Sequence, residues 1–298
     1  MNQSILETFN LTENDLLGAG AESWVYRLDN DRILRIAKGD AGKRWYLEAS
    51  KTFYDSLPKM DFALPVIYSV EERDGSIVSI ENKIPGKSLS KILPNLSRDD
   101  KQKALTNYIA SVEALREITY PDLPYGEILT KEPITSSTWK GFLSAQVNKA
   151  VSEYDLRSKV PNLEKVVDDT HALISTLADP PKSLVHGDFF PENIMLDDKL
   201  NVTGIIDFSP MTVIGDPLMD IAGGILFMEF IDGYMPVDSE ILHDIVLKKY
   251  GEGIGETIRL YRLYYSFYFS GAIDDLKMYR WCINALLNAG EGSRSKVL

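Results

Sequence analysis

Two aspartates and one asparagine have the residue types and the spacing that phosphoryl transfer requires. Asp188 and Asp207 each follow a short apolar run and lie 19 residues apart, and Asn193 lies five residues after Asp188. In phosphate-transferring enzymes one carboxylate orients the attacking hydroxyl, while an amide and a second carboxylate bind Mg²⁺ on the nucleotide phosphates. We therefore expect phosphate transfer from ATP or GTP, with Asp188 as catalytic base and with Asn193 and Asp207 as Mg²⁺ ligands.

A glycine-rich stretch near the N-terminus lies between two expected strands. Gly18, Gly20 and Ser23 fit the pattern G-x-G-x-x-G-x-V, except that serine replaces the third glycine. Glycines let a backbone fold over phosphates and point its N–H groups toward them, which predicts nucleotide binding. A glycine-rich hairpin turn explains the same residues equally well. Ser23 either adds a hydroxyl to the phosphate site or caps the turn.

A basic residue within the expected strand at residues 33–38 is the candidate phosphate contact. Arg35 and Lys38 are three positions apart, so their side chains face opposite sides of the strand. Arg35 is preferred because a guanidinium binds phosphate through two donors. Glu48 is expected at the buried edge of the following helix, paired with Arg35 or Lys38. A solvated helix charge is the alternative interpretation of Glu48.

Residues 81–86 are expected to link two lobes, because Pro85 and Gly86 interrupt the periodic pattern. In a two-lobed kinase the backbone of this linker hydrogen-bonds the purine, and Glu81 and Lys83 are accordingly assigned to nucleotide binding. The expected division is residues 1–84, a nucleotide-binding lobe with its linker, and residues 85–298, a catalytic and substrate-binding helical lobe.

The elements around these motifs predict an α+β fold. Strands are expected at residues 16–17, 24–28, 32–36, 66–70 and 76–80, where apolar residues alternate around turn residues. Residues 43–57 change to a helical period, with a stripe formed by Trp45, Ala49, Phe53 and Leu57. Beyond Gly86 helices predominate, with short strands near 184–186, 194–196 and 202–206. The fold class is thus a small antiparallel β-rich N-terminal lobe and a larger, mainly helical C-terminal lobe.

Several residues near the acidic groups have structural interpretations. His186 is expected to brace its loop through a ring hydrogen bond, and Asp216 to cap the helix that starts at Pro217. Asp220, one turn later, is expected to support the catalytic loop. Aromatic residues at near-helical spacing are expected mainly in the core, with stacking on a sugar or macrolactone as the alternative; they are Tyr261, Tyr264, Tyr265, Tyr268 and Trp281.

Composition excludes several classes of protein. The chain has 298 residues and a net charge of −12, which opposes nucleic-acid binding and is compatible with a cationic small-molecule substrate. The one cysteine, Cys282, is expected in the core. No apolar run reaches the roughly 18 residues that a membrane span needs. The N-terminus lacks a signal-peptide pattern, so a cytoplasmic enzyme without a membrane partner is expected.

The motifs together resemble the aminoglycoside phosphotransferase and choline kinase-like superfamily of small-molecule kinases. The resemblance rests on Val185-His-Gly-Asp-Phe-Phe-Pro-Glu-Asn-Ile-Met-Leu, Gly204-Ile-Ile-Asp-Phe and Gly215-Asp-Pro-Leu-Met-Asp. It implies a protein-kinase-like two-lobed fold, with the roles already given for the base and the Mg²⁺ ligands. It also implies that Arg35 contacts the phosphates and that Glu48 is its ion-pair partner.

The loop after the catalytic base departs from the family's commoner Leu-His-Pro-Gly sequence. Phe189, Phe190 and Glu192 differ from it, which affects the expected substrate class and not the chemistry. Antibiotic kinases of this group bind polycationic sugars through carboxylates of the helical lobe. The candidates in this chain are Glu229, Asp232, Asp274 and Asp275, although most surface acids are merely solvated.

The leading functional hypothesis is an O-phosphotransferase for an aminoglycoside or a related antibiotic. A macrolide, or a metabolite such as homoserine, choline or a ketosamine, is the alternative acceptor. A pseudokinase-like nucleotide-binding module is opposed by the joint presence of Asp188, Asn193 and Asp207. A metal-dependent hydrolase would leave the glycine-rich hairpin and the basic strand without a role.

Overall fold

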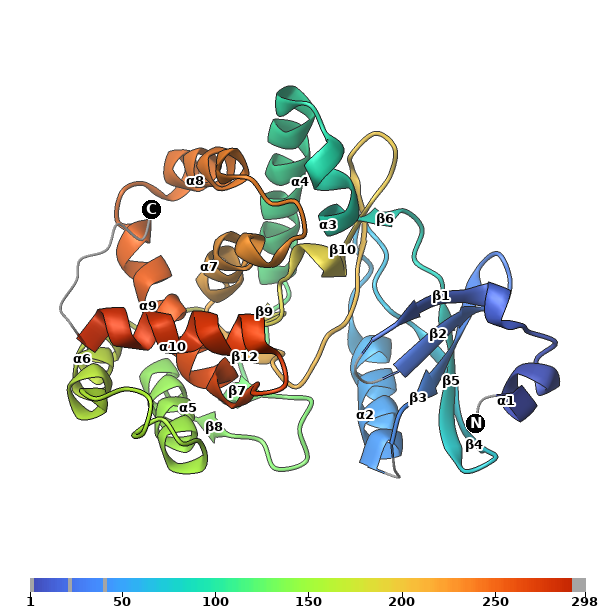
Figure 1. Cartoon of the computed structure of the whole chain (residues 1–298), viewed down its shortest axis with the longest axis horizontal. Coiled ribbons are helices and arrows are strands. Elements are labelled where there is room, and N and C mark those ends of the chain that lie inside the picture. Colours follow the sequence, from blue (N-terminus) through green and yellow to red (C-terminus); the bar gives the residue numbers. More distant parts are fainter. Residues whose placement is uncertain (1–2, 21–22, 40–41, 291–298) are drawn as a thin grey trace. The chain divides into compact units, whose positions relative to one another are not determined.

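The computed structural model describes residues 3–20, 23–39 and 42–290, and its chain forms two compact units (Figure 1). The first combines Met1–Ser88 with Asn193–Phe208, and the second combines Leu89–Glu192 with Ser209–Leu298. The first break thus falls close to the expected boundary. The segment that contains Asn193 and Asp207 belongs to the first unit. The expected division at one point of the sequence does not include this second segment.

A five-stranded antiparallel sheet in the order β1-β2-β3-β5-β4 forms the base of the first unit. The expected strands are confirmed, and the glycine-rich stretch connects the first two, although its Ala21 and Glu22 lie outside the described residues. The strands are β1 (Leu16–Ala19), β2 (Ser23–Arg27), β3 (Arg32–Ala37), β4 (Ile67–Arg73) and β5 (Ser76–Asn82).

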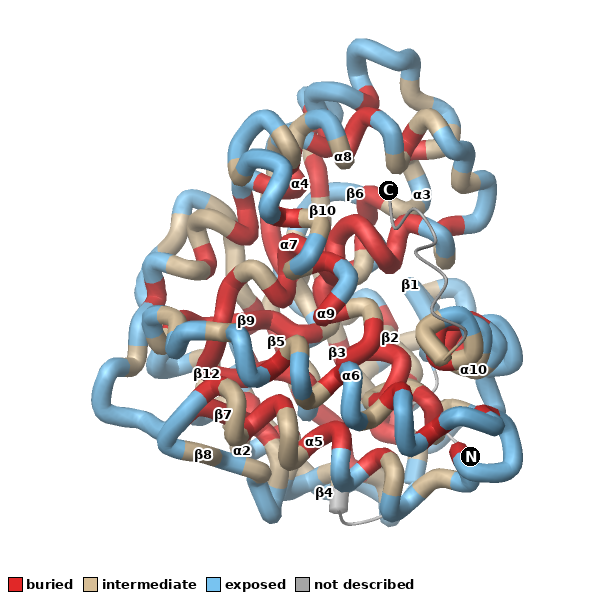
Figure 2. Tube along the Cα trace, turned by 90° about the vertical axis from the view of Figure 1, so that its left-hand side faces the viewer, coloured by how far each residue is buried: buried red, intermediate tan, exposed pale blue. Residues whose placement is uncertain are grey.

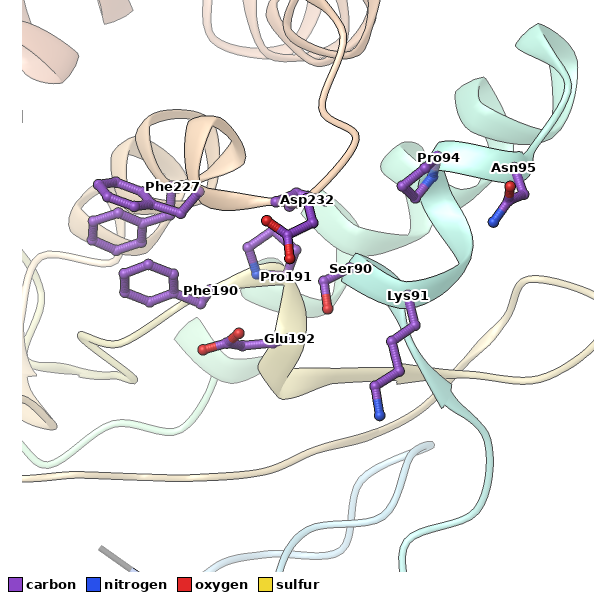
Figure 3. A pocket seen from close by; sticks show the side chains of 11 residues that line it. Ser90, Lys91, Pro94, Asn95, Phe190, Pro191, Glu192, Phe227 and Asp232 are labelled. Carbon is purple, nitrogen blue, oxygen red and sulfur yellow. The ribbon is translucent and has the colours of Figure 1, made fainter. Parts of the chain in front are cut away.

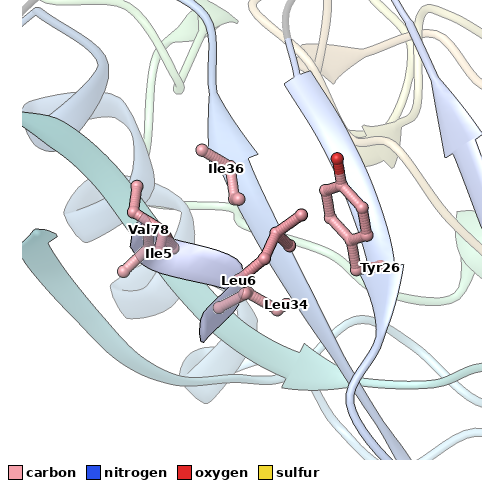
Figure 4. Close-up of a cluster of buried hydrophobic side chains, with 6 residues drawn as sticks. All are labelled: Ile5, Leu6, Tyr26, Leu34, Ile36 and Val78. Carbon is pink, nitrogen blue, oxygen red and sulfur yellow. The ribbon is translucent and has the colours of Figure 1, made fainter. Parts of the chain in front are cut away.

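Two helices pack on opposite faces of this sheet. Helix α1 (Gln3–Thr8) packs against one face, in a buried cluster that consists of Ile5, Leu6, Tyr26, Leu34, Ile36 and Val78 (Figure 4). Helix α2 (Gly42–Ser56) packs against the other face, in a cluster that consists of Leu47, Ala37, Ile67 and Ile77. Neighbouring side chains of a strand point to opposite faces, so Arg35, between Leu34 and Ile36, lies on the α2 side of β3.

The buried face of α2 differs from the expected one. Trp45 of the expected stripe is 36% exposed, whereas Leu47 is 6% and Ser50 is 1% exposed. Glu48 is exposed, and its carboxylate forms a 2.8 Å ion pair with Arg44. The prediction that Glu48 pairs with a strand cation is therefore wrong. Periodicity predicts the position of the helix, but its apolar residues fit several buried faces, and packing of Leu47 against the sheet determines which face is buried.

A three-stranded sheet completes the first unit. Strand β10 (Ile194–Leu196) pairs antiparallel with β11 (Val202–Ile205) and with β6 (Lys87–Ser88). The Ala63 N–H donates to the Thr203 carbonyl at 2.8 Å. The Thr203 hydroxyl donates to the carbonyl of Pro85, which is 118 residues away in the sequence. These bonds join the segment after Glu192 to the N-terminal part of the chain.

The second unit is mainly helical, and nearly all of its helix α7 is buried (Figure 2). Helix α4 (Arg98–Arg116) is capped by Ser97, whose hydroxyl accepts from the Asp100 N–H at 3.2 Å. Among the described residues, no helix is both long and apolar enough to cross a membrane. The helices are α3 (Leu89–Ile92), α4 (Arg98–Arg116), α5 (Trp139–Glu153), α6 (Leu163–Ser175), α7 (Leu218–Leu226), α8 (Pro236–Tyr250), α9 (Ile254–Tyr268) and α10 (Leu276–Gly290).

A small sheet in the order β8-β7-β12-β9 lies in the second unit, and short 3₁₀ helices connect other elements of the chain. The strands are β7 (Tyr125–Glu127), β8 (Thr135–Ser136), β9 (Ser183–Val185) and β12 (Val213–Gly215). The 3₁₀ helices are η1 (Glu13–Asp15), η2 (Leu93–Asn95), η3 (Pro191–Asn193), η4 (Phe227–Phe230) and η5 (Phe269–Gly271). The loop that follows β9 carries Asp188.

Candidate active site

The backbone before Asp188 is held by one buried carboxylate. The N–H groups of His186 and Gly187 donate to the two oxygens of Asp220, at 2.7 and 2.8 Å. Asp220 is 0% exposed and lies in the first turn of α7. The prediction that Asp220 supports the catalytic loop is thereby confirmed, and the loop conformation depends on a residue more than thirty positions later.

Three hydroxyl groups bind carbonyl groups of the same loop. The donors and acceptors are Thr212 to His186 at 3.1 Å, Tyr265 to Gly187 at 3.1 Å, and Tyr108 to Phe189 at 2.7 Å. The charge of Asp188 contributes to the raised pKa of Tyr265, after the larger effect of burial. Tyr265 therefore lies within electrostatic reach of Asp188. These hydroxyl contacts could not be predicted from the sequence, because each hydroxyl is distant from the loop along the chain.

Gly187 is required by the shape of the loop. Its φ is +78°, and a Cβ added there would lie 2.0 Å from the carbonyl oxygen of Met211. An L side chain would therefore both strain the backbone and collide with it. His186 is fully buried, with its ring edge-on to that of Phe189 at 5.8 Å. The expected ring hydrogen bond of His186 stays a prediction.

Asp216 connects the start of α7 to α9. Its carboxylate accepts the Leu218 N–H at 3.0 Å, although α7 begins at Leu218, one residue later than expected. It also accepts the Tyr261 hydroxyl at 2.6 Å. Complete burial raises the pKa of Asp220 to about 7; the two loop N–H groups oppose this shift, and the charge of Asp216 adds to it.

Asn193 and Asp207 lie beside one another in the first unit. Ile194 faces Ile205 in the β10–β11 pair, and the Ile206 N–H donates to the Asn193 carbonyl at 2.9 Å. The strand register therefore brings the two residues together. Asn193 is 5% exposed, whereas Asp207 is exposed and has a φ of +67°. This left-handed conformation is uncommon outside glycine and is frequent at functional positions.

The donor set at this position fits Mg²⁺. An amide oxygen from Asn193 and carboxylate oxygens from Asp207 are hard ligands, and Mg²⁺ usually takes one or two carboxylates together with phosphates and water. No group of three His, Cys, Asp or Glu side chains suited to a metal occurs in the part of the chain that the structure describes. A nucleotide-dependent Mg²⁺ site does not require such a group.

Arg35 is held by Glu81 on the neighbouring strand. Its Nε and Nη2 donate to the two carboxylate oxygens of Glu81 at 2.8 and 3.2 Å, and its Nη1 donates to Ser23 Oγ at 3.1 Å. Burial by itself would lower the pKa of Arg35, but the charge and hydrogen bonds of Glu81 raise it, and the charge of Asp207 adds to this. Arg35 therefore lies within electrostatic reach of Asp207.

Lys38 lies on the other side of β3 from Arg35, as expected. Its Nζ donates to the Gly20 carbonyl at 2.7 Å and lies 4.6 Å from the centre of the Trp24 ring. A Cβ added at Gly18 or Gly20 would meet no atom within 4 Å. Packing within the described residues therefore does not explain these two glycines, and Lys38 links their turn to the sheet.

The linker residues have other partners within the first unit. Glu81 is part of β5 and 5% exposed, and its carboxylate binds Arg35. The Lys83 N–H donates to the Asp31 carbonyl at 2.7 Å, so this amide is occupied by the protein itself. The assignment of Glu81 and Lys83 to nucleotide binding stays a prediction, and for Glu81 the structure indicates an indirect role through Arg35.

A pocket of about 460 Å³ in the second unit adjoins the catalytic loop (Figure 3). Asp232, one of the candidate substrate carboxylates, lines it. Glu229 lines another pocket at the start of α10, and Asp274 is exposed. Asp275 caps α10, accepting the N–H groups of Lys277 and Met278 at 3.0 Å each. The four candidate acids therefore do not form one site.

The aromatic residues expected mainly in the core are buried. The exposed fractions are 0% for Tyr261, 2% for Tyr264, 0% for Tyr265 and 9% for Trp281. Tyr268 is half-buried, and Cys282 is 0% exposed. The core prediction is confirmed for Tyr261, Tyr264, Tyr265 and Trp281, and two of these tyrosines also fix polar groups beside the catalytic loop.

The sheet-rich first unit and the helical second unit define an α+β fold, and the chain belongs to the phosphotransferase enzyme family, whose family model matches residues 15–250. This confirms the resemblance inferred from the motifs. Three solved structures show the same fold. One is a thermostable mutant of aminoglycoside phosphotransferase APH(4)-Ia with ADP and hygromycin B, with a TM-score of 0.72, 17% identity and 99% coverage of both chains.

The second is ADP-bound aminoglycoside phosphotransferase APH(2'')-Ib, with a TM-score of 0.63, 16% identity, and coverage of 97% of this chain and 98% of that one. The third is the GDP and kanamycin complex of APH(2'')-IIIa, with a TM-score of 0.60, 16% identity and 93% coverage of both chains. At such identities the likeness shows the fold, and the expected protein-kinase-like fold is confirmed. Comparison with curated protein sequences finds no match.

Proposed function

We propose that this phosphotransferase is a Mg²⁺-dependent kinase that transfers the γ-phosphate of ATP or GTP to a hydroxyl group of a small molecule. The supporting observation is that the strand register of the first unit brings Asn193 and Asp207 together, while Arg35 of β3 belongs to the same unit. One cation and two oxygen ligands are the groups that a nucleoside triphosphate with Mg²⁺ requires. The braced loop of the second unit supplies the carboxylate of Asp188 as base.

In the proposed reaction the acceptor oxygen forms a bond to the γ-phosphorus while the bond from that phosphorus to the bridging oxygen breaks. The nucleoside diphosphate leaves, and Asp188 receives the hydroxyl proton. Asn193 and Asp207 would hold Mg²⁺, which neutralises phosphate charge when bound. Arg35 would bind phosphate oxygens, because a guanidinium has more N–H donors than its contacts with Glu81 and Ser23 use. Positioning and electrostatics supply most of the catalysis.

The acceptor class that we place first is an aminoglycoside or a related antibiotic. Two similar structures contain hygromycin B or kanamycin, and the net charge of −12 favours a cationic substrate. A macrolide or a small metabolite such as homoserine, choline or a ketosamine is the second candidate. The aromatic residues in the pocket beside the catalytic loop favour an acceptor with an apolar face.

The test is a nucleoside-diphosphate release assay with Mg²⁺ and either ATP or GTP. The acceptors are kanamycin, hygromycin B, erythromycin, homoserine, choline and a ketosamine, with mass spectrometry of the product. We expect release that depends on one acceptor class, formation of a phosphate ester, and loss of both in Asp188→Ala with nucleotide binding retained. Full activity of Asp188→Ala would remove this residue from the role of base. Nucleotide binding without turnover on any acceptor would favour a pseudokinase-like module.

A further inference from the structure

The pocket beside the catalytic loop is lined at the positions where this chain departs from the family's commoner loop sequence. Phe190 and Glu192 both line it. Phe189 has a different role, because it is 0% exposed and stacks on Tyr108 with ring centres 4.9 Å apart. The unusual loop sequence therefore contributes one residue to the core and two to the pocket.

An aromatic wall forms one side of this pocket. The rings of Phe190 and Phe227 are parallel with centres 3.9 Å apart, and Phe230 meets Phe190 edge-on at 5.9 Å. Further rings support this group, namely Tyr265, Phe269 and Trp281. Rings packed in this way present a fixed apolar surface to a ligand.

The pocket also has two carboxylates and one ammonium group. They belong to Glu192, Asp232 and Lys91, and Figure 3 shows Lys91 on the α3 ribbon. The charges of these three lining side chains sum to −1, and a further cation, Lys277, has its Nζ 5.4 Å from the centre of the Phe230 ring. A single cation beside these carboxylates and the aromatic rings is favoured electrostatically. A polycation would bring more positive charge than the pocket can match, and Lys91 would repel it.

The pocket adjoins the proposed catalytic base along the chain. Phe190 lies two residues after Asp188, and its N–H donates to the Asp188 carbonyl at 2.8 Å. Asp188 and all residues that line the pocket belong to the second unit. A ligand of the pocket is therefore held on the same short loop that carries the base.

We propose that the acceptor is an alcohol that carries one ammonium group next to an apolar face. Phe190 and Phe230, which are partly exposed, bind the apolar face with fully buried Phe227 behind them, and Glu192 and Asp232 bind the ammonium group. This inference rests on the proposed kinase function, and because it requires one ammonium group it favours the second acceptor class given above over the polycationic aminoglycosides. The hydroxyl group receives the γ-phosphate in the reaction given above, with the nucleoside diphosphate as leaving group and Asp188 as proton acceptor. The pocket volume of about 460 Å³ suits a small ligand.

The first test is calorimetric binding to the full chain, with and without a non-hydrolysable ATP analogue and Mg²⁺. The probes are benzyl(2-hydroxyethyl)dimethylammonium, its neutral analogue 3,3-dimethyl-4-phenylbutan-1-ol, and kanamycin. We expect the ammonium alcohol to bind about tenfold more tightly than its neutral analogue, and kanamycin to bind more weakly than the ammonium alcohol. Tighter binding of kanamycin, or no binding of the ammonium alcohol under either condition, would overturn the proposal.

The second test uses substitutions that separate charge from shape. Glu192→Gln and Asp232→Asn should each weaken binding of the ammonium alcohol about threefold to tenfold and leave the neutral alcohol unchanged. Phe190→Leu should weaken both alcohols. Glu240→Gln removes an exposed carboxylate of α8 outside the pocket and should change neither. Unchanged thermal unfolding of each variant verifies its fold, and unchanged binding in all three pocket variants would contradict the inference.

The two proposals fail in different ways. If the ammonium alcohol binds as expected but no acceptor is phosphorylated, the kinase function is wrong and the pocket assignment stands. If an acceptor is phosphorylated at a rate that Phe190→Leu and Glu192→Gln do not alter, the pocket assignment is wrong and the kinase function stands.

Discussion

Arg35 and Glu81 form a two-point ion pair between the adjacent strands β3 and β5. The exposed fractions of their side chains are 26% and 7%, and both carboxylate oxygens accept N–H groups of the guanidinium. Glu48 of α2 instead pairs with Arg44, and both of these side chains are exposed. The orientation of the proposed phosphate contact is therefore set by the sheet itself and not by a carboxylate of the helix.

The first prediction compares Glu81→Gln with Glu48→Gln. Glu81→Gln leaves the Arg35 charge without its partner and should lower the free energy of unfolding by about 1–3 kcal/mol. It should also raise the nucleotide KM, because the guanidinium loses its fixed orientation. Glu48→Gln should change the free energy of unfolding by less than about 0.5 kcal/mol. Chemical denaturation and steady-state kinetics check both, and a larger effect of Glu48→Gln would restore the helix carboxylate as the partner.

The second prediction compares Arg35 of β3 with Lys38, which directly follows that strand. Arg35→Ala removes charge-assisted hydrogen bonds to phosphate and should raise the nucleotide KM about tenfold or more. Lys38→Ala removes the bond to the Gly20 carbonyl and should have a smaller effect on KM. Kinetics with varied nucleotide concentration compare the two variants. An unaltered KM in Arg35→Ala, together with a raised KM in Lys38→Ala, would transfer the phosphate contact to Lys38.

The third prediction concerns Asp207. Asp207→Ala removes a carboxylate ligand and should weaken binding of the Mg²⁺–nucleotide complex about tenfold or more. In the presence of EDTA, wild type and Asp207→Ala should bind the nucleotide with nearly equal affinity, because no Mg²⁺ is then available for Asp207 to bind. Calorimetric titration with and without Mg²⁺ measures this difference. Equal affinities of wild type and variant for the Mg²⁺ complex would contradict the assignment of Asp207 as a ligand.

The fourth prediction compares two glycines. Gly187→Ala places a Cβ against the Met211 carbonyl at a φ of +78°, and should lower the free energy of unfolding by about 3 kcal/mol or more. A Cβ at Gly20 meets no atom of the described residues within 4 Å. Gly20→Ala should therefore change the free energy of unfolding by less than about 0.5 kcal/mol. It should weaken nucleotide binding, because the added methyl group lies on the turn that is proposed to cover the phosphates. Unchanged nucleotide affinity of Gly20→Ala would identify the stretch as an ordinary hairpin turn.

The fifth prediction concerns the pH dependence of stability. Burial raises the pKa of Asp220 from 3.8 to about 7, so the folded protein keeps a proton there that the unfolded chain releases. The contribution of Asp220 to stability is therefore fully present below pH 3.8 and is lost as the pH rises to about 7. We therefore expect the free energy of unfolding of wild type, minus that of Asp220→Asn, to fall as the pH rises across this range. Chemical denaturation of both proteins at several pH values measures this difference. A constant difference would contradict the raised pKa.

Asp220→Asn should also affect catalysis through the loop. The amide nitrogen of asparagine cannot accept a hydrogen bond, so one of the two loop N–H groups loses its acceptor. We expect a lower kcat with an almost unchanged nucleotide KM, because the loop that carries Asp188 belongs to the other unit from Arg35 and Asp207. A change confined to nucleotide KM would contradict the positioning role.

The larger elements of the fold could be predicted because they have enough residues to show a period. The strands at 23–27 and 32–37 alternate around turn residues, and helix α4 has a capping residue at Ser97. The strands β6, β7, β8 and β12 have two or three residues each, too few for any periodicity, and could not be predicted. Strands β9 and β10 are equally short, but their apolar runs adjoin the motif residues Asp188 and Asn193. The apolar residues of α2 allowed several buried faces, and only packing against the sheet decides among them.

Parts of the candidate site could not be predicted because their partners are distant in the sequence. The Arg35–Glu81 pair joins residues 46 positions apart, and the Tyr265 hydroxyl binds a carbonyl 78 positions away. Asp220 was identified correctly because its place one turn into a helix after the catalytic motif constrains its position. The sequence alone identifies the three motif residues, because each lies within a few residues of a short apolar run that predicts a strand. They are Asp188, Asn193 and Asp207.

The discontinuity of the first unit has a consequence for its biogenesis. Its three-stranded sheet needs β10 and β11, which follow more than a hundred residues of the other unit. Residues 1–88 therefore emerge from the ribosome before β10, the strand with which β6 pairs, has been synthesised. The first unit, which contains the proposed metal ligands, can complete its fold only after Phe208 has been synthesised. Residues 89–192 of the helical unit have been synthesised by then.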